Sequence, residues 1–588
     1  MNRFLTVAAG LALSVTTLVS TAKALPPIMD RVPANAAIVV VIPSIEGLEK
    51  DMNSVLQLVG QPPMVRADDL LSGSGMEGLS KKGSLALVVL ESPDIESGEE
   101  PPMVAIFQAD DYAAFTKGMT TSKDGELDKG VVNGEDVWMK SIGGNYVVAG
   151  PKKEHVSAFD GKGGGGERHK KFYGSRADRM TDKADVAVFF DVARLKPLVD
   201  QGMAGVEQQM ADLAAMTGNP GNAESFKWVK EHIIADTTAG AASLSIDAQG
   251  VSLDFACVAK EGSAFAKALD TTGKAHSLLG KLPGGPYLFA YAMDMSNKNW
   301  RELFKSMPQA EGADGMGALG ALAGSDPEAL KDATGMSMVI GVPPGGIMSG
   351  VLTRATGYVQ TSTPEKVIAF YRDELPKALE KDELGKMEYK SAVKEIEGKK
   401  VDSFTLTLTP DEGMQGMGQQ VITGLFGMSG GPTAYIAAVD GGVVSTLSQS
   451  TEMMTAAIKA TKGENTFTSD KTLGAVAEKL PAGRMIEGYV GVKDLLDVLL
   501  KMAPMMGAPE VKVKIPEKLP PVAGGVAIGD GQAQATFYIP SDVFKTGGEI
   551  FNAFNNPPVE EGGDEGGDGM KKDGEPAPQD DKKDKPKF

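Results

Sequence analysis

The amino-acid sequence predicts an α+β fold with mainly antiparallel sheets and packed helices, duplicated in the order A-B-A′-B′. An apolar strand followed directly by an amphipathic helix recurs four times along the 588 residues. Strand pairs joined by short turns favour antiparallel pairing. The elements after these openings also repeat in order. A period this long indicates duplication of a domain pair rather than a short solenoid repeat.

The four openings share one pattern, in which a short apolar run gives way to helical periodicity. Pro33, Pro283 and Pro481 precede three of the strands, at a point where no ladder donor is yet needed. We expect the strands at 37–42, 185–190, 287–292 and 485–490, and the helices at 45–59, after 191–195, around 300–304 and at 493–500.

The first and third openings lead into longer units than the second and fourth. Two strands, a helix, a further strand pair and a short helix follow each of them, and this order resembles a ferredoxin-like plan. The second and fourth openings lead into a hairpin and a closing helix. The sequence places these elements at 84–91, 103–108, 111–118, 131–142, 146–149 and 153–159; at 241–258 and 263–269; at 336–342, 349–360, 363–379, 400–408, 434–447 and 451–460; and at 522–539 and 541–554.

These repeats divide the chain into two halves between two terminal segments. The first half covers 32–270, with A at 32–180 and B at 181–270. The second half covers 282–555, with A′ at 282–478 and B′ at 479–555. Residues 556–588 are rich in acids, lysine, glycine and proline and cannot bury enough apolar surface to fold, so we expect a disordered tail.

The first 24 residues have the order of a secretory signal peptide. Basic Arg3 precedes an apolar run over 4–19, and Ala22-Lys23-Ala24 supplies the small-residue cleavage step. Position 25 is leucine rather than cysteine, which argues against a lipoprotein anchor. We therefore expect cleavage after Ala24, a periplasmic or secreted protein, and no membrane span in the mature chain.

Charge and cysteine content narrow the classes of partner. Removing residues 1–24, which carry two basic residues and no acid, takes the net charge from −19 to −21. Such a chain is repelled by nucleic acid and by anionic lipid surfaces. The single cysteine, Cys257, excludes an intramolecular disulfide. Alternation in 251–257 predicts a half-buried strand with Cys257, Leu253 and Phe255 on its inner face.

The motifs that could carry catalysis all lack their context. Three G-x-G-x-x-G matches, at 73–78, 161–166 and 315–320, are expected by chance among 72 glycines. Ser429 lies in a G-x-S-x-G pattern, but a hydrolase of that type needs a later histidine, and the last one is His276. The histidines also lack metal-ligand spacing. We therefore predict no catalytic, cofactor-binding or metal-binding residues and no cofactor.

Two histidines and one charged stretch have specific interpretations. His232 follows Trp228 by four positions on a helix, which predicts stacking on the indole, and His155 is expected to be solvated. Residues 151–171 are locally basic within an acidic chain. A solvated loop is the ordinary interpretation, and a docking point for an anionic envelope polymer is the alternative.

The opening VPANAAIVVV at 32–41 and the stretch GGNYVVAGP at 143–151 resemble uncharacterised families of exported bacterial proteins. These families are domains of unknown function, with repeated strand–helix units that begin at a proline, a small residue and an apolar strand. The resemblance could cover most of 32–555. It implies a location in the cell envelope and no known activity, so it supplies no catalytic residues.

The sequence favours a non-enzyme. The leading hypothesis is an exported, non-catalytic protein that binds or scaffolds an unknown envelope component. A second hypothesis is a carrier that encloses an apolar ligand between curved sheets, and a third is a hydrolase of unrecognised type. A continuous apolar cavity would favour the carrier, and convergent acids with shifted pKa values in a cleft would favour the enzyme.

Overall fold

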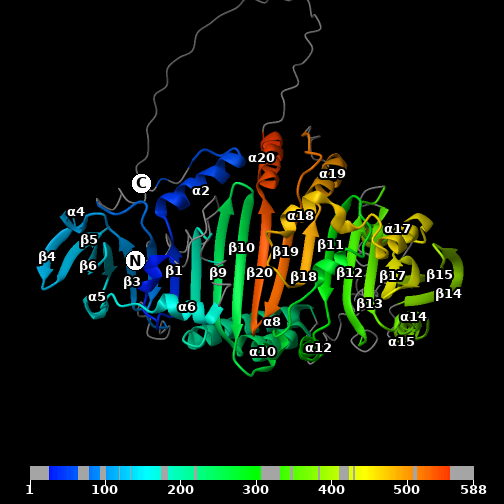
Figure 1. The fold of residues 1–588 in the computed structure, drawn as a ribbon, viewed down its shortest axis with the longest axis horizontal. Coiled ribbons are helices and arrows are strands. Elements are labelled where there is room, and N and C mark those ends of the chain that lie inside the picture. Colours follow the sequence, from blue (N-terminus) through cyan, green and yellow to red (C-terminus); the bar gives the residue numbers. More distant parts are fainter. Residues whose placement is uncertain are drawn as a thin grey trace, which may run out of the picture.

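A computed structural model describes residues 26–555 except 64–65, 67–77, 93–100, 118, 133, 174–179, 181–182, 218–220, 306–330, 345–348, 382–384, 409–422, 428–430 and 507–512. The predicted signal peptide and the predicted disordered tail therefore lie outside the described residues. Helices and antiparallel strands are both abundant, which confirms the α+β class. The described strands form a single open sheet of 20 strands (Figure 1).

The first half contributes ten strands to this sheet. They are β1 (Ile38–Ile42), β2 (Leu85–Val89), β3 (Met103–Gln108), β4 (Thr120–Asp124), β5 (Leu127–Val132), β6 (Glu135–Gly143), β7 (Tyr146–Gly150), β8 (Val186–Asp191), β9 (Thr237–Asp247) and β10 (Gly250–Ala259). The helical segments are η1 (Pro27–Asp30), α2 (Ile45–Leu58), α4 (Tyr112–Lys117), α5 (Lys153–Ala158), α6 (Gly165–Tyr173), α8 (Lys196–Thr217), α9 (Gly221–Val229), η2 (Lys230–Ile234) and α10 (Ala264–Ala268).

The second half contributes the other ten strands. They are β11 (Tyr287–Asp294), β12 (Ala333–Gly341), β13 (Ala355–Thr361), β14 (Gly385–Ile396), β15 (Lys399–Leu408), β16 (Thr433–Val439), β17 (Gly442–Thr446), β18 (Arg484–Val490), β19 (Val522–Gly529) and β20 (Gln532–Pro540). The helical segments are α11 (Ala275–Leu279), which lies between the two halves, and then α12 (Lys298–Lys305), η4 (Val351–Arg354), α14 (Pro364–Ala369), η5 (Phe370–Glu374), α15 (Leu375–Lys381), α17 (Thr451–Thr461), η8 (Phe467–Ser469), α18 (Lys471–Ala477), α19 (Val492–Met502), η9 (Ala503–Met506) and α20 (Ser541–Asn555).

The two halves have the same strand order. The first half runs β4-β5-β6-β7-β3-β2-β1-β8-β9-β10 across the sheet. The second runs β14-β15-β16-β17-β13-β12-β11-β18-β19-β20, so adding ten to each label converts one order into the other. This agreement is the order expected of a duplication. The A/B boundaries stay a prediction, because the sheet runs through them without a break.

The halves join edge to edge through β10 and β20 in antiparallel register. Asp254 pairs with Thr536, and both residues occupy the same place in their respective hairpins. A pseudo-two-fold axis therefore passes through the centre of the sheet. Because β10 and β20 pair with each other, neither is left as an exposed edge strand. Exposed edge strands are prone to pair with other chains.

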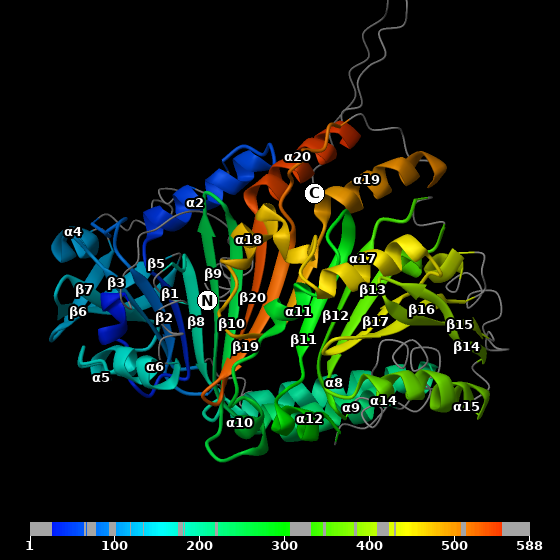
Figure 2. The ribbon, with the colours of Figure 1, turned by 45° about the vertical axis from the view of Figure 1, so that its right-hand side comes forward.

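Helices lie at both ends of the strands and on one face of the sheet. One row, formed by α2, α20 and α19, follows one end of the strands, and α10, α12, α14 and α15 follow the other (Figures 1 and 2). Several helices begin at side-chain caps: Ser44 and Ser263 accept hydrogen bonds from backbone amides three residues on.

One face of the sheet carries the two largest hydrophobic clusters. In the second half, Leu278 and Leu279 of α11 pack with Val339 of β12 and Tyr489 of β18. In the first half, Ile28 and the residues around it pack against strands β1, β2 and β3 in the same way. We call this side of the central strands the covered face.

The sequence missed three strands and part of the strand order. Strands β4, β5 and β14 are rich in polar residues, and β14 is an outer edge strand on which alternating lysines and glutamates block further pairing. The ferredoxin-like plan does not occur among the described strands. In that plan another strand separates the two joined by the first helix, whereas β1 pairs directly with β2.

The predicted inner face of strand β10 was wrong. Asp254 is buried beneath the covered face, whereas Leu253 and Phe255 are exposed on the opposite side. Cys257 shares their side and is only partly buried, beside Trp228 at one margin. The alternation of apolar and polar residues correctly indicated that β10 has two different sides. The buried side is the one that carries Asp254, not the one that carries Leu253 and Phe255.

Candidate functional site

The central strands expose large apolar side chains on the side opposite the covered face. The exposed fractions are 52% for Phe255, 43% for Phe537, 39% for Phe289 and 37% for Leu253. We call this side, defined by these four residues, the open face. Soluble proteins rarely leave such side chains exposed together, and patches of this kind mark binding surfaces.

The strand register shows that the four residues share one side. Leu253 lies opposite Phe537, and Phe537 lies opposite Gly524. Gly524 in turn pairs with Gly488, which pairs with Tyr291, two residues from Phe289. Directly paired residues point to the same side of a sheet. One row across five strands therefore carries two aromatic residues separated by two glycines.

The flanking rows are also apolar. On one side, Val522 pairs with Val490, which pairs with Phe289. On the other, Phe255 pairs with Ala535, Ala535 with Val526, Val526 with Ile486, and Ile486 with Met293. Apart from the Tyr291 hydroxyl, these rows present no side chain that forms ordinary hydrogen bonds and none that carries a charge.

The same strands bury polar groups on the covered face. Thr536 and Gln534 both donate to Oδ1 of Asp254, the latter at 3.4 Å. These three side chains are buried across the β10–β20 junction. Buried polar groups need partners, and here each half satisfies the other across the pseudo-two-fold axis.

The densest polar centre of the covered face surrounds Glu487. Its carboxylate is fully buried and accepts hydrogen bonds from Arg484 Nε at 2.8 Å, from the Tyr489 hydroxyl and from the imidazole of His276, whose Nδ1 is 2.8 Å away. Burial alone would raise the pKa of the Glu487 carboxyl, but these donors hold that pKa below its usual value. Burial and the Glu487 charge raise the pKa of Tyr489.

This centre joins segments that are far apart in sequence. His276 belongs to α11, between the two halves, and the other three side chains belong to β18. Because the donors saturate the carboxylate, its role is to hold α11 on the sheet. Sequence reasoning missed this centre. The available signal was a glutamate in the middle of an apolar strand, two residues from a tyrosine and three from an arginine.

A second acidic centre lies under α2. Burial raises the pKa of Asp51 to about 7 and that of Asp185 to about 8, and the Asp51 charge adds to the effect on Asp185. The backbone amide of Ile246 donates to Asp185 Oδ2 at 3.0 Å. Two buried carboxyl groups in contact share a proton at neutral pH. Asp51 is a buried residue of α2 and Asp185 directly precedes β8, so the pair links this helix to the sheet.

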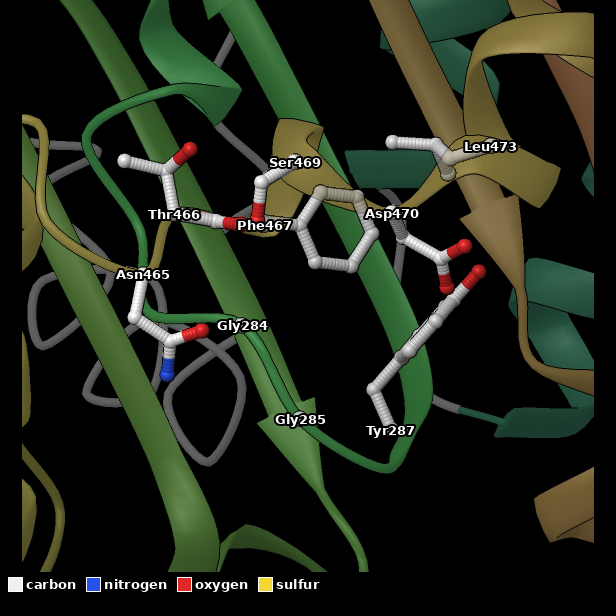
Figure 3. A pocket seen from close by; sticks show the side chains of 9 residues that line it. All are labelled: Gly284, Gly285, Tyr287, Asn465, Thr466, Phe467, Ser469, Asp470 and Leu473. Carbon is white, nitrogen blue, oxygen red and sulfur yellow. Dashed lines mark hydrogen bonds between the residues drawn. The ribbon is translucent and has the colours of Figure 1, made fainter.

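A small polar hollow of about 220 Å³ opens beside the start of β11 (Figure 3). The Tyr287 hydroxyl and the Asp470 carboxylate lie close together at its edge (Figure 3). Asp470 Oδ1 already accepts the Thr472 amide at 2.8 Å as the cap of α18, and Ser469 donates to the Thr466 carbonyl. These polar groups are engaged in local structure, and the hollow is too small and too polar for the enclosed chamber of a carrier.

The structure places the remaining histidines in structural settings. His232 stacks on Trp228 with ring centroids 5.0 Å apart, which confirms the predicted contact. His169 is buried edge-on against Phe189, and burial lowers the pKa of its imidazole to about 4. His155 is partly buried rather than fully solvated.

Some of the sequence motifs lie within the described residues, and others lie outside them. Gly163 packs so closely on the Asp30 carbonyl that no side chain would fit, so the 161–166 glycines serve packing. The 315–320 glycines, Ser429, and the cleavage residues Ala22 and Ala24 lie outside the described residues. In the basic stretch, Lys153, Arg168 and Lys170 form ion pairs with acids of this chain, which reduces the charge left for an anionic polymer.

Within the described ranges, no group of three or more histidine, cysteine or acidic side chains is placed to hold a metal ion. Among the helices that the structure describes, none is long and apolar enough to cross a membrane. No protein-family model, curated protein or solved structure matches the chain. The proposal for function therefore depends on this chain's own geometry.

Proposed function

We propose that this chain is an exported, non-catalytic binding protein of the cell envelope and that the open face is its docking surface. The observation that supports this is the exposure of Phe255, Phe537, Phe289 and Leu253 on one side of the central strands. Fully burying an exposed Leu or Phe side chain contributes about 1.5–3 kcal/mol. These side chains are already about half buried, so covering each one contributes roughly 1 kcal/mol, and a partner gains from covering the set.

The docking surface can be tested with the apolar dye bis-ANS. The mature chain should enhance dye fluorescence, and the F255S/F537S double variant should bind the dye at least about tenfold more weakly. Phe551→Ser is the matched control, because Phe551 is 57% exposed but lies on α20. Equal binding by all three proteins would contradict the proposal.

Export is tested separately by N-terminal sequencing of the protein from its native host. Cleavage after Ala24 leaves Leu25 as the first residue. Retention of Met1 would contradict export to the envelope, and it would not affect the proposal that the open face is a docking surface.

A further inference from the structure

A second hollow, of about 230 Å³, lies on the outer strands β14, β15 and β16, next to the segment that leads into α17. These strands stand at one end of the sheet, away from the open face (Figures 1 and 2). Ser403 of β15 and Tyr435 of β16 line the hollow. They are directly paired, so their side chains lie next to each other on one side of the sheet.

The hydroxyl groups of Ser403 and Tyr435 set this hollow apart. Each residue is only 5% exposed, and among the described residues neither hydroxyl has a hydrogen-bond partner. Buried polar groups in folded proteins nearly always have a partner, so two unpaired neighbours need an explanation. Because both residues line the hollow, a small polar molecule inside it can supply the missing hydrogen bonds.

The first half fills the equivalent place with a side chain. Lys129 pairs with Trp138 between β5 and β6, as Ser403 pairs with Tyr435 between β15 and β16. In both halves the residue before the lysine or serine is an aspartate that accepts a tyrosine hydroxyl, which supports the equivalence. Lys129 Nζ lies 5.8 Å from the centroid of the Trp138 ring. A serine in place of that lysine leaves space beside the aromatic ring.

The rest of the lining selects a neutral ligand. Lys390 forms an ion pair with Glu388 at 2.9 Å, so an anion would meet a carboxylate and a cation would meet an ammonium group. Thr405 Oγ1 accepts from Gln449 Nε2 at 3.4 Å and keeps its own proton to donate. Val393 adds an apolar contact. A sugar ring matches this mixture, because its hydroxyls both donate and accept and its C–H groups are apolar.

We propose that this hollow binds one sugar unit of a neutral saccharide through the hydroxyls of Ser403 and Tyr435. The site goes beyond the proposed function, because it lies on other strands than the open face and takes a polar ligand. Its volume is below the roughly 300–1,000 Å³ of pockets for drug-sized ligands, so it encloses one ring. Further units of a longer saccharide extend past the exposed Glu388 and Lys390 into solvent.

Two substitutions test the site in the purified protein. Ser403→Lys introduces the lysine of the first half and fills the hollow. Tyr435→Phe removes one hydroxyl without breaking a hydrogen bond of the described chain. Ser141→Lys is the control, because it adds the same side chain at an exposed serine of β6. Circular dichroism and thermal melting check that each variant folds.

The probes are glucose, galactose, mannose and N-acetylglucosamine, each titrated by saturation-transfer NMR, and inorganic phosphate, titrated by phosphorus NMR. At least one sugar should bind saturably, with a Kd below about 10 mM. S403K should weaken binding at least about tenfold, Y435F about threefold to tenfold, and S141K should leave it unchanged.

Three results would overturn the inference. They are the absence of saturable binding for all four sugars, saturable binding of phosphate alone, and equal sugar binding by the wild type and a folded Y435F or S403K variant. Binding of bis-ANS to the open face should be the same in S403K and the wild type, so a failure here leaves the proposed docking surface in place.

Discussion

The two faces of the central strands reverse the usual relation between polarity and burial. On the covered face, Asp254, Thr536 and Glu487 are polar and buried. On the open face, Phe255 and Phe537 are apolar and exposed. The backbone is shared, so the difference comes from which side chains the helices cover. On the open side they cover only the margins, where Val251 packs with Leu48 of α2 and Cys257 packs with Trp228 of α9. The middle of that side keeps apolar surface available for a partner.

This contrast also means that one strand can contribute to stability through one side and to binding through the other. The buried carboxylates of Asp254 and Glu487 are tolerated on the covered face because each accepts hydrogen bonds from neighbouring side chains. Apolar groups on the open face have no such covering, and their exposure costs solubility unless a ligand occupies them. Substitutions on the two sides of one strand should therefore affect different properties.

The largest expected effect is on the covered face. Glu487→Ala leaves the nearly buried Arg484 guanidinium without its counter-ion, and breaking a buried pair in this way costs about 3–5 kcal/mol. Denaturant unfolding of the purified protein measures the loss. Glu388→Ala, which removes an exposed ion pair with Lys390, should cost less than about 1 kcal/mol. Similar losses in both variants would show that the Glu487 centre does not hold the covered face together.

An intermediate effect is expected from the acid pair beneath α2. Asp51 and Asp185 have raised pKa values in the folded chain, so between about pH 4 and pH 8 the folded state keeps protons that the unfolded state has released. The free energy of unfolding therefore falls as pH rises through this window. Asp51→Asn should stabilise the chain by about 1–3 kcal/mol at pH 8 and by nothing measurable near pH 4.

Urea titrations from pH 4 to pH 8 measure this difference. Asp200→Asn is the control, since Asp200 is exposed in a surface ion pair with Lys196. A parallel pH dependence of the wild type and D51N would mean that the two carboxyl groups do not share a proton. Stabilisation of D51N at high pH alone would show that the two carboxyl groups share a proton in the folded protein.

The smallest effect on stability is expected on the open face. Phe255→Ser removes a side chain that is half exposed, so the free energy of unfolding should change by less than about 1 kcal/mol. The same substitution should weaken bis-ANS binding, which separates binding from folding. A loss above about 3 kcal/mol would mean that Phe255 is covered in the folded protein, and the contrast between the faces would disappear.

The sequence predicted much of the fold because its signals are local. Strands β1, β8, β11 and β18 lie at the four predicted openings, and the repeat order matches the strand order of the two halves. Polar strands such as β14 lack the apolar alternation on which the prediction depended. The Asp254 side of β10 faces α6, whose Tyr173 shares a buried cluster with Ala256, and α6 lies far away in sequence, so no local pattern could reveal it.

The candidate site was less predictable for the same reason. Gly488, Gly524 and Phe537 come together only through the register of β18, β19 and β20. Glycines within apolar strands were visible in the sequence, but their pairing was not. The predicted absence of catalytic and metal-binding residues stays a prediction, and so does the location in the envelope.

The most direct test of the open face uses the fact that Cys257 is the only cysteine. In a Cys257→Ser background, Ala535→Cys places one thiol on the open face and leaves its four defining residues intact, and Phe551→Cys places one on α20. The measurement is the rate of thiol modification by a charged reagent, with and without bis-ANS. The account predicts that both thiols react readily in the free protein and that bis-ANS protects only position 535. An unreactive thiol at 535, or equal rates with and without bis-ANS, would contradict it.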